Sequence, residues 1–565
     1  MTKHFANKIA LVGIVFFATA FSFFPLTDTD IWWHLACARE WVTTWTPVRT
    51  PVVNVHEYFQ LAVGAVYGLG GAPLLVAFKA LLWCVVFTLF LHPARHSECH
   101  SELVSESVSL FKCHAGLIPA SPSLLKLTVS AFLLFVFRYH FEIRPVLLSL
   151  LFLGIYWNVL PRLFNERLCE PHRGETLFPV PCSLKPVTLL LVFAVLFIQW
   201  LWCKCQGLYI LGPIFATLVL GAEFFEEKRR GGLYIKWSAK TIVPQVGFVW
   251  LLWLMPFLHR EGLGLFLYPF GLLDRLLGLN PSAAVFASQI AENRSPLTLL
   301  MAGENVLDDL LMLLMSLAGV VIGIKYLVLI MCHPERNTAR YVVEGSRYLW
   351  FLITAILVLI AERNLVLFLP VFLSVFWGAC DKLRKFLSSK FYQLSPDTVV
   401  RTPNSELRIK TLVSRLMPHV SRLSSLVFLA FLLGLWGRSV SAYDSAVAYR
   451  RVPVEAAKWM AEHPHAGRLF NDDRAGGYLA FVNPADSVYI DGRFILKTAD
   501  FFERYLSYAQ DPARFIADAD SLGVDRAVFP LRYYARWDSL WRALERDSRW
   551  HLVYRDEYFA VFDKE

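Results

Sequence analysis

Charged residues are scarce in this chain. They make up 18% of its 565 residues, whereas hydrophobic residues make up 56%. A single soluble core could not hide that much apolar surface. The composition excludes an ordinary one-domain soluble protein and predicts a membrane-embedded block with room for an appended domain.

Cysteine and the common catalytic motifs are also sparse. There are ten cysteines and none follows Cys380, so no disulfide framework is expected. Cys203 and Cys205 close an apolar run, where small helix residues are a better interpretation than a metal site. The chain has no phosphate-cradling P-loop, nucleophile elbow or zinc-protease motif, which excludes those enzyme classes.

Positive charge is concentrated in short loops. The net charge is +9, and basic residues such as those between Lys228 and Lys240 separate apolar runs. This is typical of cytoplasmic loops of membrane proteins, and no nucleic-acid partner is expected.

The apolar runs predict a polytopic α-helical membrane protein with about eleven transmembrane helices. With the N-terminus in the cytoplasm, the basic loops fall on the cytoplasmic side, and the first loop, the 259–305 loop and the C-terminal domain fall opposite. The expected spans are 9–26, 72–91, 126–142, 145–160, 187–203, 208–225, 241–258, 306–330, 349–361, 364–380 and 424–440.

Two domains are expected. Residues 1–440 form the transmembrane domain, with a first external loop at 27–60 and a polar insertion at 96–126 that we interpret as a disordered cytoplasmic loop. Residues 441–565 form a small soluble α/β domain on the periplasmic side. Its expected helices are 454–462, 511–519 and 537–546, and its expected strands are 487–490, 526–530, 550–554 and 558–562.

The start of the first loop is the most informative segment. Asp28 and Asp30 precede the aromatic stretch Ile31–His34 at the expected bilayer edge. In one interpretation the carboxylates end a span in solvent and the tryptophans form an interfacial belt. In the other, the aromatic helix lies along the membrane and fixes a carboxylate over a lipid-borne substrate.

The end of the same loop carries His56 and Glu57 at similar depth. Together with His34, Asp28 and Asp30 they offer ligands for a divalent cation. No fixed metal-ligand spacing supports such a site, so the metal remains unknown and no cofactor is firmly expected.

Several short motifs follow one another in an order that resembles a known family. The chain resembles the GT-C class of membrane glycosyltransferases, in particular its RgtA/B/C/D-like, protein-mannosyltransferase-like bacterial members. The matching stretches are DTDIWWHLACAREW from Asp28, HEYFQ from His56, YGLGG from Tyr67, RYHFEIRP from Arg138, ERNLVLFLP from Glu362, GGYL from Gly476 and YIDGR from Tyr489.

This resemblance implies a catalytic acid in the first external loop, which corresponds to Asp30 with Asp28 as its neighbour. It also implies a polyprenyl-phosphate-linked sugar donor in the membrane, and transfer to a glycan, lipid or protein acceptor of the cell envelope. The expected location is the bacterial inner membrane, with transfer on the periplasmic face. The chain departs from the family where relatives show WxNxHG, because Lys204 and Gln206 replace the Asn and the His.

The chemistry needs a base and a cation. A carboxylate that takes the proton of an acceptor hydroxyl allows a single inverting displacement, and a cation stabilises the departing phosphate. The candidate cations are Arg363, then Arg144 and Arg294, each of which also suits an interface role. His34, His56 and Glu57 are further candidates for substrate and phosphate binding.

In the soluble domain, Asp491 and Gly492 predict a turn that presents Arg493. Asp491 and Arg493 are candidates for acceptor binding, although Asp-Gly turns are usually structural.

Two other functions stay open. A transporter or flippase of lipid-linked glycans would carry ionisable residues near the middle of several spans. An inactive glycan-binding assembly protein would fit the loss of the WxNxHG element.

Overall fold

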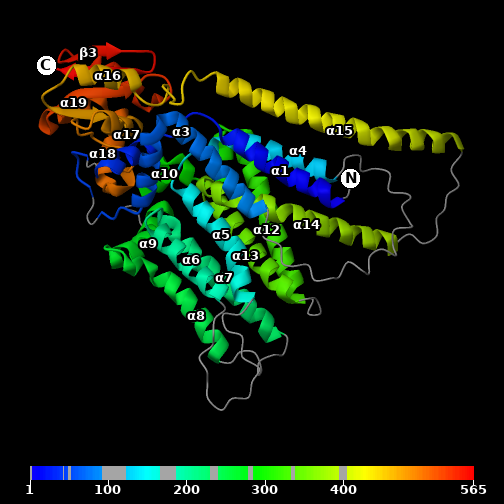
Figure 1. The fold of residues 1–565 in the computed structure, drawn as a ribbon. Helices are drawn as coiled ribbons and strands as arrows, with labels where there is room; N and C mark the ends of the chain where they lie inside the picture. The colour runs from blue at the N-terminus through cyan, green and yellow to red at the C-terminus, as the bar shows by residue number, and fades with distance from the viewer. Residues whose placement is uncertain are drawn as a thin grey trace.

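The computed structural model describes residues 3–41, 44–48, 52–91, 122–165, 186–229, 239–277, 284–332, 338–393 and 404–565. The helices form one bundle, and a small mixed α/β unit lies at one end of it (Figure 1). Most of the expected insertion at 96–126 lies outside these residues. Its last residues, 122–126, are helical and open α4, because Leu124, Leu125 and Leu127 continue an apolar helix.

The bundle consists of long apolar helices. Within the described ranges, eight helices are long and apolar enough to cross a membrane, which confirms the polytopic α-helical membrane class. The bundle helices are α1 (Lys3–Ser22), α3 (Glu57–Leu91), α4 (Pro122–Val136), α5 (Val146–Asn165), α6 (Pro186–Cys203), α7 (Leu211–Arg229), α8 (Ala239–Leu254), α9 (Gly262–Leu277), α12 (Val306–Cys332), α13 (Thr338–Ile360), α14 (Leu365–Gln393) and α15 (Asn404–Ser441).

The remaining three of the eleven expected spans coincide with shorter apolar helices, at Val187–Cys203, Val243–Leu258 and Gly345–Ile360. A fourth short apolar helix, Gly262–Leu272, lies in the segment expected to be the 259–305 loop. That segment also holds α10 (Ala284–Gln289), α11 (Pro296–Ala302) and the turn Ala291–Asn293. The segment 259–305 therefore contains several short helices rather than an irregular loop.

Helix α3 is broken at the YGLGG motif. Gly70 and Gly71 have non-helical backbone angles, and Gly71 has a φ of 62°. A side chain is strained in that left-handed region, so glycine is required there. Pro73, which lacks an N–H, then starts the helical part that coincides with the expected span 72–91. The break lets the first part of α3 follow the external loop while the second part enters the bundle.

The C-terminal unit is a four-stranded sheet with helices against it. Its strands are β1 (Arg468–Asn471), β2 (Val524–Pro530), β3 (Trp550–Arg555) and β4 (Phe559–Lys564), in the order β1-β2-β4-β3. β1 pairs parallel with β2, while β4 pairs antiparallel with both β2 and β3. Its helices are α16 (Val454–Glu462), α17 (Asp473–Val482), α18 (Ala499–Gln510), α19 (Pro512–Leu522) and α20 (Asp538–Leu544).

The predicted strand at 487–490 is wrong. This segment joins no sheet, and groups outside the sheet satisfy part of its backbone. The Asn471 side chain accepts a hydrogen bond from Tyr489 N at 2.8 Å and donates one to Ile490 O at 2.7 Å. Trp45 N of the first loop donates to Val488 O at 3.1 Å. The segment is thus hydrogen-bonded to the first loop.

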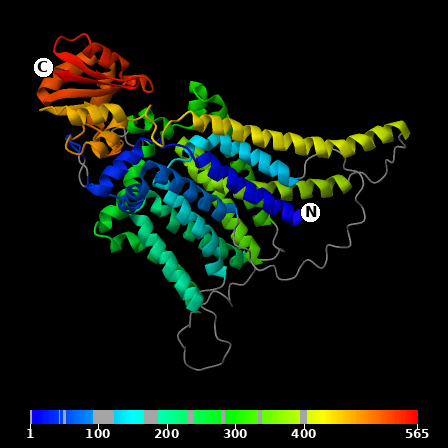
Figure 2. The same cartoon turned by 45° about the horizontal axis from the view of Figure 1, so that its top comes forward.

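The first loop and the C-terminal unit share a hydrophobic core. Trp32 of α2 (Asp30–Arg39) is 1% exposed, and its ring lies 4.8 Å from that of Tyr478 and 5.7 Å from that of Phe481. Truncating such a buried tryptophan costs about 3–5 kcal/mol. In two views the C-terminal unit lies beside α2 and the start of α3, while α15 extends along α4 (Figures 1 and 2).

Candidate active site

The candidate site begins where the chain leaves α1. Pro25 follows that helix, and the Asp28 carboxylate then accepts a hydrogen bond from Asp30 N at 3.3 Å. This short-range bond is the usual way in which an aspartate stabilises a turn. Thr29 is the N-cap of α2, so Asp30 occupies its first turn, where the helix dipole favours a carboxylate.

Asp28 is held by a shared arginine. Arg144 Nε donates to one Asp28 oxygen at 2.8 Å, and Nη2 donates to the other at 3.2 Å. Arg144 Nη1 donates to both oxygens of Glu292 at 2.9 Å. Although burial opposes it, these carboxylates raise the pKa of Arg144 well above its ordinary value. The Arg144 guanidinium in turn lowers the pKa of Glu292 to about 2.

Asp30 has a different environment. Among the described residues it makes no ion pair, and its carboxylate accepts a hydrogen bond from the Trp33 indole at 3.3 Å. Burial and the charge of Asp28 raise the pKa of Asp30 to about 7. Its Oδ1 also lies against Gly492, where a Cβ would collide with it. Asp30 is thus a carboxyl group that exchanges a proton near neutral pH.

Two glycines of the C-terminal unit make room for this loop. A Cβ on Gly477 would come within 3.0 Å of Trp33 N and 3.4 Å of Thr29 O, and a Cβ on Gly492 would come within 3.0 Å of Trp33 Nε1. The motifs GGYL and YIDGR therefore contribute close backbone packing against α2.

A second guanidinium lies beside the Asp28–Arg144–Glu292 group. Arg363 Nη1 donates to the Asn293 amide oxygen at 3.0 Å, next to Glu292. Within the described part of the chain, Arg363 makes no ion pair with a carboxylate. Arg294 contributes its backbone carbonyl, which accepts from Glu362 N at 3.0 Å. The three predicted arginines therefore gather around the segment 292–294.

Of the two histidines of the first loop, His34 is buried and His56 is half-buried. His34 is 2% exposed, and its ring lies 4.8 Å from that of Phe59 and 5.3 Å from that of His56. Burial, followed by the charge of His56, lowers the pKa of His34 well below its ordinary value, and burial lowers the pKa of His56 to about 4. Both rings are neutral at pH 7, so neither offers a charge to a phosphate.

Glu57 forms an ion pair with Lys204, the residue that stands at the Asn position of the WxNxHG element. Lys204 Nζ lies 2.8 Å from a Glu57 oxygen and 2.6 Å from a Glu261 oxygen, and its side chain is 4% exposed. Although burial opposes it, Glu261 and Glu57 raise the pKa of Lys204. Gln206 accepts a hydrogen bond from Leu208 N at 2.6 Å and so caps the turn that follows.

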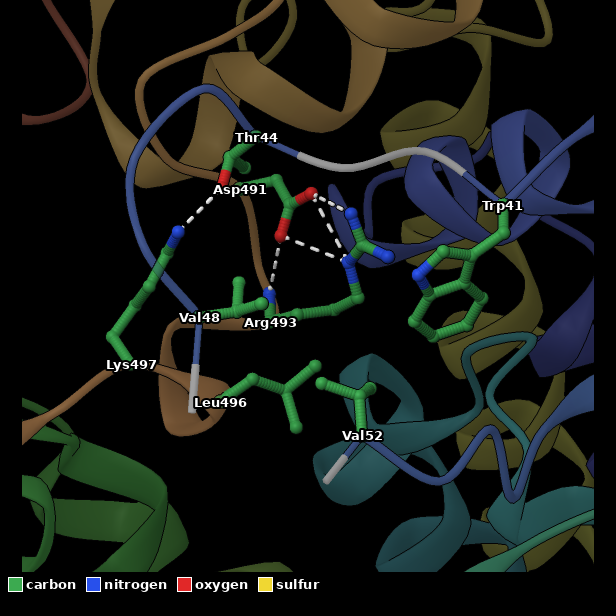
Figure 3. Close-up of a pocket in the computed structure, with 8 residues that line it drawn as sticks. All are labelled: Trp41, Thr44, Val48, Val52, Asp491, Arg493, Leu496 and Lys497. Carbon is green, nitrogen blue, oxygen red and sulfur yellow. Dashed lines mark hydrogen bonds and ion pairs between the residues drawn. The ribbon is translucent and has the colours of Figure 1, made fainter. Parts of the chain in front are cut away.

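The predicted turn at Asp491 and Gly492 is present. Asp491 Oδ1 accepts from Arg493 N at 2.9 Å, and both carboxylate oxygens accept from Arg493 Nε at 3.1 Å (Figure 3). Asp491 and Arg493 also line a small open pocket between this turn and the first loop.

The five predicted cation ligands do not converge. Asp28 is paired with Arg144 and Glu57 with Lys204, and the His34 and His56 rings meet edge to face. In the described ranges, no group of three or more His, Cys, Asp or Glu side chains is placed to hold a metal ion. The Arg144 guanidinium lies between the carboxylates of Asp28 and Glu292, where a metal would need to bind, so these residues do not fit a metal site.

Sequence reasoning missed Glu292, Asn293 and Gly492 as site residues. The signal for Glu292 and Asn293 is the polar stretch Glu292–Arg294 inside an otherwise apolar segment. The sequence around Gly492 indicates a turn and carries no signal for its contact with Asp30.

Comparison with known proteins gives a structural likeness only. No family model matches the sequence, and no curated protein matches it. The structure is similar to that of the archaeal oligosaccharyltransferase AglB from Archaeoglobus fulgidus in complex with an inhibitory peptide and a dolichol-phosphate, at 11% identity and a TM-score of 0.45, covering 93% of this chain and 69% of that one.

It is also similar to ArnT from Cupriavidus metallidurans bound to undecaprenyl phosphate, at 14% identity and a TM-score of 0.43, covering 99% and 97% of the two chains. Another similar structure is the Archaeoglobus fulgidus oligosaccharyltransferase in complex with Zn and sulfate, at 11% identity and a TM-score of 0.46. The match covers 93% of this chain and 68% of that one. AglB and ArnT are GT-C glycosyltransferases, the class that the sequence motifs resemble.

Proposed function

We propose that this chain is a membrane glycosyltransferase that moves a sugar from a polyprenyl-phosphate-linked donor to an acceptor hydroxyl of the cell envelope. The reaction takes place on the periplasmic face of a bacterial inner membrane and inverts the anomeric centre. The observation that carries this proposal is the environment of Asp30: a carboxyl group without an ion pair among the described residues, with a pKa of about 7, at the membrane end of a loop braced by indoles.

Asp30 acts as the general base. The acceptor oxygen attacks the anomeric carbon while the bond from that carbon to the phosphate oxygen breaks. The hydroxyl proton passes to the Asp30 carboxylate, and the polyprenyl phosphate leaves with the bonding electrons. A base is most effective when its pKa is close to the working pH, because it is then both ionised and basic enough. Asp28 assists by raising the pKa of Asp30 while it holds Arg144 in place.

Arg363 and Arg144 bind the donor phosphate. Arg363 is the stronger candidate, since its described bond is to the Asn293 amide, which leaves its charge available to an anion. Each hydrogen bond from a guanidinium to a phosphate contributes about 1.5–3 kcal/mol. Arg144 is one-third exposed but already forms ion pairs with Asp28 and Glu292. Its main effect is therefore to position Asp28.

The test is Asp30→Asn. The amide keeps the shape of the side chain but cannot accept the proton, so transfer should fall about 10²–10⁴-fold. The measurement is incorporation of labelled sugar from a polyprenyl-phosphate donor pool into envelope material by membranes that contain equal amounts of inserted protein. Asp444→Asn is the matched control, because Asp444 is exposed just beyond α15. Undiminished transfer by the Asp30→Asn protein would contradict the proposal.

The placement of charge favours an enzyme over a transporter. Asp28, Arg144 and Glu292 lie in segments that connect the long helices rather than within them. Lys79 lies within α3, but its ammonium donates to Phe24 O at 2.8 Å, just beyond the end of α1. Faster movement of labelled lipid-linked glycan across vesicles containing this protein, with no sugar transfer, would favour the transporter instead.

A further inference from the structure

Three arginines and two tyrosines gather where the parallel strands β1 and β2 end. This Arg474 cluster consists of Arg451, Arg474, Tyr533, Tyr534 and Arg536. Arg474 lies in the first turn of α17, which follows β1, and the two tyrosines lie in the loop that follows β2. The Arg474 guanidinium lies 3.7 Å from the centre of the Tyr534 ring and 5.5 Å from that of Tyr533. The carboxyl ends of neighbouring parallel strands are a common location for ligand sites.

The cluster has hydrogen-bond donors without acceptors. Within the described part of the chain, the side chains of Arg474 and Arg536 make no hydrogen bond and no ion pair. Stacking on Tyr534 uses the face of a guanidinium, so the N–H groups in its plane stay available. The Tyr533 hydroxyl is buried and also lacks a partner among the described residues. A buried donor without an acceptor is rare in proteins, and a bound group is one explanation of it.

Two carboxylates near the cluster are already hydrogen-bonded. Asp472 accepts from Arg474 N at 3.3 Å and from Ala475 N at 3.2 Å, and Asp473 accepts from the Tyr505 hydroxyl at 2.8 Å. Among the described residues, neither aspartate forms an ion pair with the cluster. Burial and the charge of Asp473 raise the pKa of Asp472 to about 7, so Asp472 carries only part of its negative charge at neutral pH. The three guanidinium groups therefore outweigh the two aspartates in charge.

Arg451 connects the cluster to the expected membrane edge. Its Nη1 donates to Thr27 O at 3.3 Å, just beyond the end of α1. The apolar helix α15 ends at Ser441, shortly before Arg451. The charge of Arg451 also acts on the Tyr533 hydroxyl. The cluster thus lies beside the ends of two apolar helices, at the level expected for lipid headgroups.

We propose that the Arg474 cluster binds the phosphate of an anionic membrane lipid. The guanidinium groups of Arg451 and Arg474 bind the phosphate oxygens, and the phosphate supplies the acceptor that the Tyr533 hydroxyl lacks. The lipid holds α17 on the bilayer surface, and α17 in turn packs through Gly477 against Trp33 N. This phosphate site is separate from the one proposed for the sugar donor, and it does not depend on the proposed function.

The experiment compares two short-chain lipids, phosphatidylglycerol and phosphatidylcholine, of which only the first has a net negative charge. Each is titrated against the full chain in neutral detergent, and bound lipid is counted by native mass spectrometry. Phosphatidylglycerol should bind about tenfold more tightly. Arg474→Gln should weaken its binding about fivefold, and Arg474→Lys should retain most of it. Arg514→Gln, at an exposed arginine of α19, is the matched control and should change nothing.

Two further variants separate binding from folding and from the donor site. Tyr533→Phe removes only the hydroxyl, so it should weaken phosphatidylglycerol binding a few-fold without lowering the melting temperature of the lipid-free protein. Arg363→Gln should leave this binding unchanged. Three results would overturn the inference: equal binding of the two lipids, a loss of binding in Arg363→Gln but not in Arg474→Gln, or displacement of the lipid by an equal concentration of inorganic phosphate.

Discussion

The two ends of the first loop, 27–60, carry similar residues, but their carboxylates have different partners. At the beginning, Asp28 shares Arg144 with Glu292, and Asp30 accepts a hydrogen bond only from an indole among the described residues. At the end, Lys204 binds both Glu57 and Glu261 within 3 Å. At the beginning of the loop, Asp30 has no ion pair among the described residues. At the end of the loop, both carboxylates are paired with Lys204.

This difference shows why residue types alone do not identify a catalytic group. A carboxylate in a close ion pair is fixed in its charged form, so it is a poor proton acceptor at neutral pH. One placed near other carboxylates and away from water takes up a proton more readily. We therefore assign chemistry to the Asp30 end of the loop and a structural role to the Glu57 end.

The largest effect is expected from a substitution that displaces the Asp30 carboxylate while Asp30 itself is kept. Gly492→Ala places a methyl group where the Asp30 carboxylate lies, and a shift of about 1 Å at a reacting group can cost on the order of 10²-fold in rate. Sugar transfer should fall by about that factor while membrane insertion is retained. Gly434→Ala in α15 is the control, since its Cβ would meet nothing within 4 Å. A Gly492→Ala protein as active as the control would mean that Asp30 is not the base.

The pH dependence of transfer sharpens the comparison. The pKa of Asp30 is raised to about 7, so its carboxylate form predominates above pH 7 and is lost below it. The rate should therefore fall up to about tenfold for each pH unit below 7. Asp28→Asn should move the midpoint to lower pH, because the charge of Asp28 raises the pKa of Asp30. A rate that stays constant between pH 5 and 8 would argue against this role.

The smallest effect is expected at the end of the loop where Lys204 is paired with Glu57 and Glu261. Lys204→Met leaves two carboxylates facing each other and should destabilise the folded protein by about 1–2 kcal/mol, less than for a fully buried pair because Glu57 is nearly half exposed. The measurement is the melting temperature in detergent. Lys458→Met, which breaks an exposed pair with Glu455, should leave it unchanged. Loss of transfer out of proportion to folding would show that Lys204 takes part in the chemistry.

Much of the membrane architecture could be predicted because lipid imposes long apolar helices. The expected spans coincide with observed helices, and the helix at 454–462 and the final hairpin were placed well. β1 and α17 were missed, because Asn471, Asp472 and Asp473 suggest a polar turn. In the structure Asp472 instead caps α17 by accepting from Ala475 N and Arg474 N.

The site was only partly predictable, because its contacts join residues far apart in the sequence. The motifs predict that Asp28, Asp30, Arg144 and Arg363 act together, and in the structure Arg144 bonds Asp28 while Arg363 bonds Asn293, next to Glu292. The pairing of Arg144 with Glu292 and the closeness of Gly492 to Asp30 depend on how distant segments pack. No local pattern encodes either contact.

The core shared by α2 and the C-terminal unit has a consequence for biosynthesis. A ribosome completes every helix of the bundle before Gly477 and Gly492 emerge, and these two residues brace the loop that bears Asp30. The nascent chain can therefore be inserted in the membrane while its active site is still unformed. On the proposed function, a chain truncated after α15 lacks Gly477 and Gly492 and should be unable to transfer sugar.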